Sequence, residues 1–244
     1  MSGLSQTMSA EQKQVLSAAA DDLLLLARLH DREPDMEMLQ SLSSTPARDW
    51  FALQVKGEGM EQGLGLLDDG LSDLSPLRVD ELWVDYADLY LTFGKRIAPN
   101  ESYWLTEDHI ERQDPMFDVR GWYAHYALAA KDWRMRPDDH LVHEIEFVAT
   151  LLRKENEVAI RDAGRFMDGH LLLWSADFLG GAAQRAQTPF YAGLALVTEA
   201  CLLAVRSLVE GITGEPRRQH IKVQPPSADA SKTAPFLPGA EPSW

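Results

Sequence analysis

The chain has 244 residues, of which 45% are hydrophobic, enough for a sizeable core in one large domain or two small ones. Acidic residues outnumber basic ones by 38 to 23, and the net charge of −15 argues against nucleic acid or an anionic bilayer as the main partner. A single cysteine, Cys201, excludes an internal disulfide and any zinc or iron–sulfur site that needs several cysteine ligands. We therefore expect a cytoplasmic protein. Residues 1–14 carry no signal-peptide pattern, and no apolar run approaches the roughly 18 residues of a membrane span.

Helical periodicity continues along almost the whole chain, without the sustained alternation of apolar and polar residues that is typical of strands. Ser9 and Gln12 have the spacing of a capping box, which predicts a first helix from there to about His30. The stretch 57–70 is ambiguous, because its five glycines disfavour a helix while its apolar residues keep helical spacing. Further helices are predicted near residues 35–42, 47–55, 75–94, 115–130, 137–160, 163–186 and 189–214. Between them, residues 94–114 predict a packed loop that contains two large aromatic side chains.

These patterns predict an all-α fold, with nine or ten helices in a single globular domain over residues 1–214. The last 30 residues hold 6 of the 13 prolines, which predicts a Pro-rich disordered tail over 215–244. That tail carries three acids and four bases, so residues 1–214 keep a net charge of −16. The acidity therefore belongs to the folded body.

The densest polar cluster runs from Arg136 to Phe147 and resembles the acidic start of a helix. At about 100° per residue, one narrow stripe contains Leu141, Ile145, Val148 and Leu152, and its flank contains His140, Glu144, Phe147 and Leu151. His143 points well away from both. The two histidines are therefore not expected to converge. A metal site of His140, His143 and Glu144 is an alternative, although the spacing differs from the two-histidine pattern of zinc hydrolases. A polar rim on a buried helix is the simpler interpretation.

A second stripe, with residues four positions apart, consists of Phe166, His170, Trp174 and Phe178. Most of it is expected to be core. A buried imidazole needs hydrogen-bond partners, and we hypothesise that Asp139 pairs with His170 if their helices pack antiparallel. Glycine-rich phosphate loops and the GxSxG nucleophile motif are absent from the sequence, so catalysis is not the favoured interpretation.

Three motifs follow one another in a particular order: Tyr86-Ala-Asp-Leu89-Tyr90, then Ala98-Pro99-Asn100-Glu101-Ser102-Tyr103-Trp104, then Pro137-Asp138-Asp139-His140 with Glu144-Ile145-Glu146-Phe147. Over about residues 10–212 the chain resembles the TorD/DmsD family of molybdoenzyme-specific chaperones. The resemblance implies an all-helical cytoplasmic protein that binds the twin-arginine signal peptide of a molybdopterin oxidoreductase, holds the apoenzyme until its cofactor is inserted, and delays export. It implies a peptide-binding groove that includes Tyr86, Leu89, Tyr90, Trp104, Pro137, Asp139 and His140.

Three positions differ from the family pattern and leave the client enzyme open: Arg136 stands where an acid is usual, Tyr90 replaces phenylalanine, and Asn100 occupies a site that is often aromatic or proline. The resemblance also suggests guanine nucleotide binding, but it assigns no residues to that binding. Components of molybdenum cofactor biosynthesis or export are further implied partners. We expect no bound metal or cofactor, no nucleic-acid partner and no stable membrane insertion.

The chemistry of such a signal peptide leads to the same residues independently. Paired guanidinium groups followed by an apolar stretch need carboxylates beside aromatic and aliphatic surface. The carboxylates are supplied by Asp138, Asp139 and Glu144. The aromatic surface is supplied by Tyr86, Tyr90 and Trp104. Two alternatives stay open at this point. One is a small all-α metalloprotein or hydrolase centred on Asp139, His140, His143 and Glu144, and the other is a structural helical adaptor.

Overall fold

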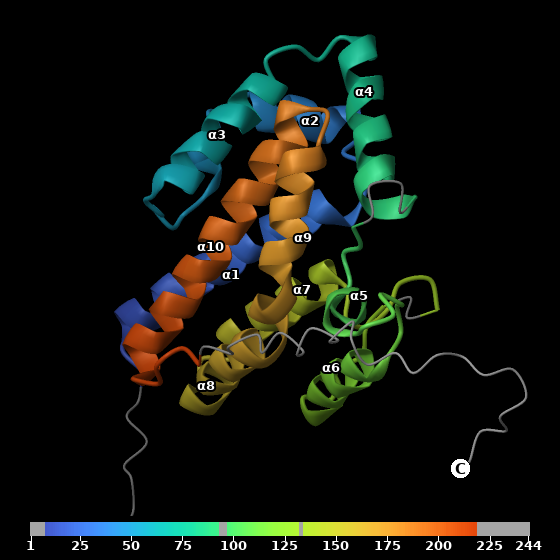
Figure 1. Cartoon of the computed structure of the whole chain (residues 1–244). Helices are drawn as coiled ribbons and strands as arrows, with labels where there is room; N and C mark the ends of the chain where they lie inside the picture. The colour runs from blue at the N-terminus through green and yellow to red at the C-terminus, as the bar shows by residue number, and fades with distance from the viewer. Residues whose placement is uncertain (1–7, 93–96, 132–133, 219–244) are drawn as a thin grey trace, which may run out of the picture.

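The computed structural model describes residues 8–92, 97–131 and 134–218, and these residues form an all-α fold (Figure 1). Within them no strand occurs, and the one β-bridge joins Asn100 to His140. The α-helices are α1 (Ala10–Asp31), α2 (Met36–Ser43), α3 (Glu58–Gly70), α4 (Pro76–Tyr86), α5 (Glu101–Leu105), α6 (Asp114–His125), α7 (Leu141–Leu152), α8 (Glu157–Phe166), α9 (Leu172–Arg185) and α10 (Pro189–Thr213). A 3₁₀ turn, η1 (Ala47–Trp50), and two π segments, η2 (Ala87–Leu91) and η3 (Met167–Leu171), complete the described elements.

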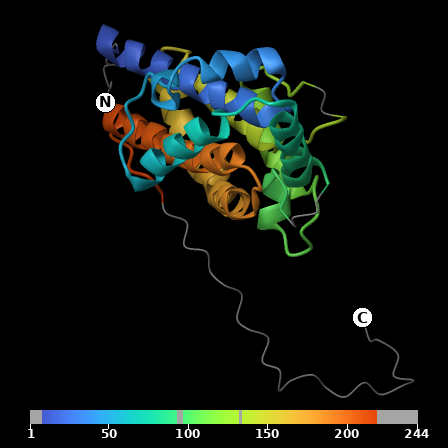
Figure 2. The same cartoon turned by 90° about the horizontal axis from the view of Figure 1, so that it is seen from above.

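The long helix α10 forms the centre of the molecule, and α1, α3, α8 and α9 pack against it (Figure 1). Helix α1 also packs against α7. Figure 2 shows α1 lying along one side of the body, with α4 at the edge. The start of α10 is held by the end of α4. There the buried Asp85 accepts hydrogen bonds from the backbone N–H groups of Gln187 and Thr188 and from the Thr188 hydroxyl. Helix α4 therefore positions α10 through a carboxylate cap.

Two of the five glycines of 57–70, Gly63 and Gly70, serve close packing against α10, which resolves the ambiguity of that stretch. Residues 58–70 form α3, and its Gly63 faces Gly193 of α10. A Cβ atom on Gly193 would lie 2.6 Å from the Gly63 carbonyl oxygen, so only glycine allows this approach. In contrast, Gly65 faces open space.

Several predicted boundaries were wrong, and the largest error concerns the helix expected over 137–160. Helix α7 begins only at Leu141, because Asp138 and Asp139 form a turn and His140 is extended and pairs with Asn100. It ends at Leu152, Glu155 has a φ of 52°, and the Asn156 side chain caps a new helix, α8. Residues 163–186 are likewise divided among α8, η3 and α9. The predicted helix 75–94 is α4 followed by η2, only 47–50 of the predicted 47–55 is helical, and the predicted loop 94–114 contains α5.

The expectation that no apolar run is long enough to span a membrane also needs correction. Helix α10 has 25 residues and a mean hydropathy of 1.7 over its most apolar window, so it passes that test by length and composition. In this fold it is the central core helix, with other helices packed along it, and its packing accounts for its apolar composition.

The chain remains attached to the body beyond the left-handed Gly214 that ends α10. The Glu215 carboxylate pairs with Arg161 and Arg165 of α8, and the Arg218 backbone N–H donates to the Asp168 carboxylate. Residues 219–244, which make up most of the predicted disordered tail, lie outside the described residues.

Candidate functional site

Two of the three motifs meet at the C-terminal end of α1. The Tyr86 hydroxyl donates to the Asp31 carbonyl oxygen at 2.8 Å, and the Tyr90 hydroxyl lies 2.5 Å from His30 Nδ1. From the third motif, the Arg136 guanidinium donates to the carboxylate and the carbonyl of Asp31, at 2.5 and 2.7 Å. His30 and Asp31 therefore connect the aromatic motif around Tyr86 with the segment that leads into α7.

The aromatic residues of the first motif are mostly buried. Tyr86 is only 3% exposed and stacks on Tyr90 with 4.7 Å between ring centroids, and Leu89 is fully buried. Tyr90 keeps a partly exposed side and also contacts Phe178 of α9. Trp104 of the second motif is half-buried, and its indole N–H donates to the Ala98 carbonyl at 2.7 Å. Of the predicted aromatic surface, Tyr90 and Trp104 thus reach solvent.

The second and third motifs are hydrogen-bonded to each other. The Leu141 N–H donates to the Pro99 carbonyl at 2.8 Å, and the Glu101 N–H donates to the Asp139 carbonyl at 3.0 Å. The Asp139 carboxylate accepts from the Ser102 N–H and hydroxyl at 2.8 and 2.5 Å. Asp139 therefore acts as a cap for the short helix α5, and one of its oxygens stays buried without a partner among the described residues.

A buried group of carboxyls lies beneath these loops. His170 Nδ1 lies 3.1 Å from both oxygens of Glu101, so the hypothesis that His170 pairs with Asp139 is wrong, because α5 places Glu101 nearer. Glu144 accepts a hydrogen bond from the Trp174 indole at 3.3 Å. Burial raises the pKa of Glu101 and Asp139, and it raises the pKa of Glu144 well above its usual range.

Asp138 and Pro137 are buried as well. The Asp138 carboxylate pairs with Arg120 of α6 at 2.7 Å, and its carbonyl accepts from the Tyr123 hydroxyl. The carboxylates of Asp138, Asp139 and Glu144 are thus all buried, and each already has a partner within the chain. None of the three presents an open carboxylate at the surface in this structure.

The two histidines of the third motif make separate contacts. His140 is the N-cap of α7, and its Nδ1 accepts from the Val142 N–H at 3.1 Å. The His143 ring lies 6.0 Å away between centroids and bonds the Pro137 carbonyl instead. Burial lowers the pKa of both, most strongly for His140. Across the described part of the chain, no group of three or more His, Cys, Asp or Glu is arranged to hold a metal ion.

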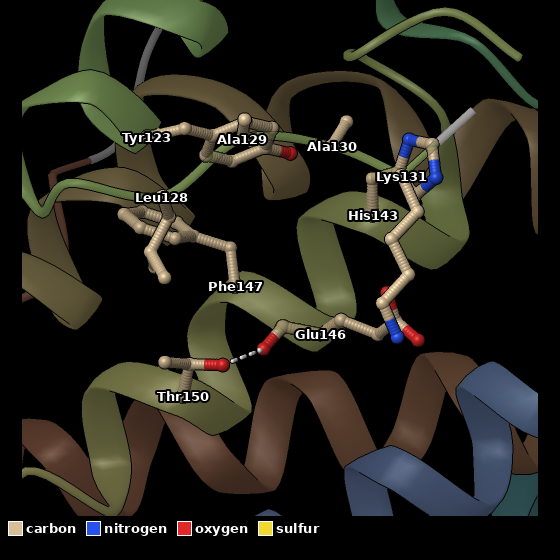
Figure 3. Close-up of a pocket in the computed structure, with 9 residues that line it drawn as sticks. All are labelled: Tyr123, Leu128, Ala129, Ala130, Lys131, His143, Glu146, Phe147 and Thr150. Atoms are coloured by element: carbon tan, nitrogen blue, oxygen red, sulfur yellow. Dashed lines mark hydrogen bonds between the residues drawn. The ribbon is translucent and has the colours of Figure 1, made fainter. Parts of the chain in front are cut away.

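Two adjoining depressions follow α7 and share Lys131, His143 and Glu146. Figure 3 shows the smaller one, of about 120 Å³, where Tyr123, Leu128 and Phe147 form an apolar end and Lys131 and Glu146 a charged end. The larger, of about 440 Å³, continues toward Asp31 and Arg136. It therefore reaches the junction at the end of α1.

A third depression, of about 750 Å³, separates α6 from α8 and η3. It is lined by Phe117, Asp118, Gly121, Trp122, His125, Asp162, Gly169 and His170. We call it the α6–η3 cleft. His170 is the point where this cleft touches the buried carboxyl group.

Sequence reasoning missed His30, Asp31 and Arg120, which hold the motifs together. No motif marks these residues. The one available signal was Asp31, an acid at the end of α1 just before Pro34. A helix C-terminus favours a cation over an acid, so an aspartate there calls for a cationic partner.

Comparisons with known proteins place the chain in a family. The family model described as "Nitrate reductase delta subunit" matches residues 55–180, slightly more than half of the chain. A protein named Chaperone protein TorD from Vibrio vulnificus (strain YJ016) is 25% identical over 191 residues, which cover 73% of this chain and 88% of the relative. The TorD protein of Shewanella loihica is 26% identical, over 78% of this chain and 92% of its own length. The TorD protein of Aliivibrio fischeri is 28% identical, over 69% of this chain and 84% of its own length. The resemblance indicated by the three motifs is thereby confirmed, and the chain belongs to the TorD-like family that the nitrate reductase delta subunit model describes.

Proposed function

We propose that the chain is a cytoplasmic maturation chaperone for a molybdopterin oxidoreductase of the DMSO reductase type. It binds the twin-arginine signal peptide and the apo form of the client's catalytic subunit, assists cofactor insertion and delays export. Family membership supports a role in molybdoenzyme maturation in general, since the relatives are named as chaperones. Components of cofactor biosynthesis or export are the further partners of this proposal.

The observation that carries the proposal is that hydrogen bonds connect all three motif segments, the first with the third at the end of α1 and the third with the second at Asp139. Segments near residues 86–90, 97–104 and 136–144 are far apart in sequence, yet hydrogen bonds join all three through Asp31, His30 and Asp139. A depression of about 440 Å³ lies beside Asp31 and Arg136. Such a junction next to a groove suits recognition of an extended peptide.

Within this proposal the nine predicted site residues take different roles. Tyr90 and Trp104 contact the peptide, because they are partly exposed. Tyr86 supports Tyr90 by stacking on it, and Leu89 and Pro137 are buried parts of the same motifs. Asp139, His140 and Glu144 hold the loops in place, and Asp138 holds Arg120.

The test is calorimetry with a synthetic twin-arginine signal peptide and the variant Trp104→Ala. We expect the wild type to bind with micromolar or tighter affinity and the variant to bind about tenfold more weakly, since one aromatic contact is worth about 1–2 kcal/mol. The matched control is Trp83→Ala. Trp83 of α4 is also half-exposed and also donates its indole N–H to a carbonyl, that of Pro34, but it lies outside the motifs.

The melting temperatures of both variants separate binding from folding. Both substitutions remove a partly buried indole and one hydrogen bond, so similar losses of stability are expected. The proposal is contradicted by an absence of binding heat with several twin-arginine peptides. It is equally contradicted if Trp104→Ala and Trp83→Ala bind with the affinity of the wild type.

A further inference from the structure

The proposed function leaves one chemical requirement unmet at the motif residues. Two guanidinium groups need accessible carboxylates, preferably beside aromatic faces. The carboxylates of Asp138, Asp139 and Glu144 are buried and bonded to Arg120, Ser102 and Trp174. Asp139 and Glu144 each keep one oxygen without a partner among the described residues, but both side chains are fully buried. An arginine could reach them only by displacing the residues that cover them, so an open acid elsewhere is the better partner for it.

The α6–η3 cleft offers such an acid. Asp118 is exposed, lines the cleft and pairs with no other residue in the described part of the chain. Across the cleft, Asp162 is already bonded to Arg165 and to the Tyr126 hydroxyl. Asp118 is therefore the carboxylate free to accept the two parallel hydrogen bonds of a guanidinium.

Aromatic faces lie on both sides of Asp118 in sequence and share its face of α6. Phe117 is 54% exposed, and Trp122, one turn further along the helix, is half-buried. The chain itself already stacks a guanidinium here, since the Arg120 side chain lies 5.3 Å from the centroid of the Phe117 ring. This geometry is the one that arginine adopts on aromatic rings.

Two glycines keep the cleft open. Gly121 of α6 lies one turn after Phe117, and Gly169 lies opposite on η3. A Cβ atom built on either would meet no atom within 4 Å. The volume of about 750 Å³ is enough for more than one extended side chain.

We propose that the α6–η3 cleft is the subsite that binds the paired arginines of the signal peptide, with Asp118 as the carboxylate and Phe117 and Trp122 as the stacking faces. The occupant is thus a cationic peptide segment, chosen by charge complementarity and by the aromatic faces. This subsite rests on the proposed function and adds to it the residues that recognise the arginines. The apolar stretch of the peptide is left to Tyr90 and Trp104.

Two variants test the cleft by different means. Asp118→Asn keeps the shape of the side chain and removes its charge, and Gly121→Leu fills the cleft from an exposed helix position without a clash. With a fluorescently labelled twin-arginine peptide, we expect each variant to weaken binding about tenfold, as measured by anisotropy. Replacing both peptide arginines with lysine should weaken binding to the wild type and should have a much smaller effect on Asp118→Asn.

Matched controls come from other helices. Asp80 of α4 is exposed and pairs with no described residue, so Asp80→Asn removes the same charge away from the cleft. Gly65 of α3 also faces open space, so Gly65→Leu is the control for Gly121→Leu. Both controls should bind the peptide within twofold of the wild type.

The outcomes separate the subsite from the proposed function. If the wild type binds the peptide and both cleft variants bind within twofold of it, the subsite is overturned while the chaperone function stands. If the wild type binds no twin-arginine peptide, both fall. Weakening in the two cleft variants, with intact binding in Asp80→Asn and Gly65→Leu, supports the subsite.

Discussion

At the scale of single residues, the junction at the end of α1 depends on a fully buried histidine. His30 contacts the Tyr90 hydroxyl on one side and the Thr198 hydroxyl on the other, at 2.5 and 2.8 Å. Burial lowers its pKa to about 3. The imidazole is therefore neutral in the folded protein at any pH in which the protein operates, and it serves as a hydrogen-bonding link between α1, η2 and α10.

The first consequence at this scale is a pH dependence of folding. Between pH 6.5 and about 3 the unfolded chain binds a proton at His30 and the folded chain does not, so stability falls as the pH is lowered through this window. His140 and His143 have lowered pKa values and act in the same direction. We expect the histidines to contribute less to the free energy of unfolding, measured with urea, at pH 5.5 than at pH 7.5.

The variant His30→Gln isolates the contribution of this residue. The unfolded variant binds one proton fewer than the unfolded wild type at low pH. The change in the free energy of unfolding with pH should therefore be smaller by at most about 1.4 kcal/mol per pH unit. The buried carboxyls with raised pKa values, Glu101 and Glu144, oppose the histidines, because their folded forms hold protons that the unfolded chain has released. Identical slopes for wild type and His30→Gln would contradict the assignment.

At the scale of elements, the contact between α3 and α10 requires glycine on both helices. Besides the Gly63 carbonyl, a Cβ on Gly193 would meet the Leu67 backbone nitrogen at 2.9 Å. Backbone atoms cannot move aside as the end of a flexible side chain can. The helices would have to separate, with a loss of packing along both.

We therefore expect Gly193→Ala to lower the free energy of unfolding by about 1–3 kcal/mol, although alanine favours a helix over glycine by about 1 kcal/mol. Gly65→Ala in α3 is the control. It meets nothing within 4 Å and should stabilise the chain by a few tenths of a kcal/mol or more. The free energies of unfolding of both variants are measured by urea denaturation. Equal stabilisation by Gly193→Ala and Gly65→Ala would show that α3 and α10 do not approach so closely.

The elements also show what the sequence could predict. The capping box of Ser9 and Gln12 and the apolar stripe of α7 are local patterns, and both are confirmed. The gap between α7 and α8 was missed because the periodicity of apolar residues continues across it, while the break comes from the left-handed Glu155 and the Asn156 cap. The start of α7 was placed too early because Pro137 suits a helix start, whereas the observed start follows from the long-range pairing of Asn100 with His140, which is extended.

The contact between the motif segments could be predicted from the sequence, and the burial of their carboxylates could not. The motifs identified which segments would meet. Whether a carboxylate faces solvent or a partner depends on residues from other elements, such as Arg120 for Asp138 and Ser102 for Asp139. Sequence spacing carries no information on such long-range partners, so the burial of these acids emerged only from the packing.

At the scale of the whole molecule, the net charge of −15 on 244 residues should guide a cationic peptide toward the body. We expect the association rate of a twin-arginine peptide to fall by about tenfold as salt rises from about 0.05 to 0.5 M, with a smaller change in the dissociation rate. Stopped-flow fluorescence measures both rates. A peptide with glutamine in place of both arginines is the control, and an equally steep salt dependence for it would contradict steering by the paired charges.

The ion pairs of Glu215 with Arg161 and Arg165 have a consequence for the charge on the wall of the α6–η3 cleft. Arg165 divides its guanidinium between Glu215 and Asp162, so the cation that neutralises this wall is shared with the segment that follows α10. A chain cut after Gly214 would return Arg165 wholly to Asp162. Glu215 thereby sets how much of the Arg165 charge is left for Asp162 in the wall of the cleft, although Glu215 itself does not line the cleft.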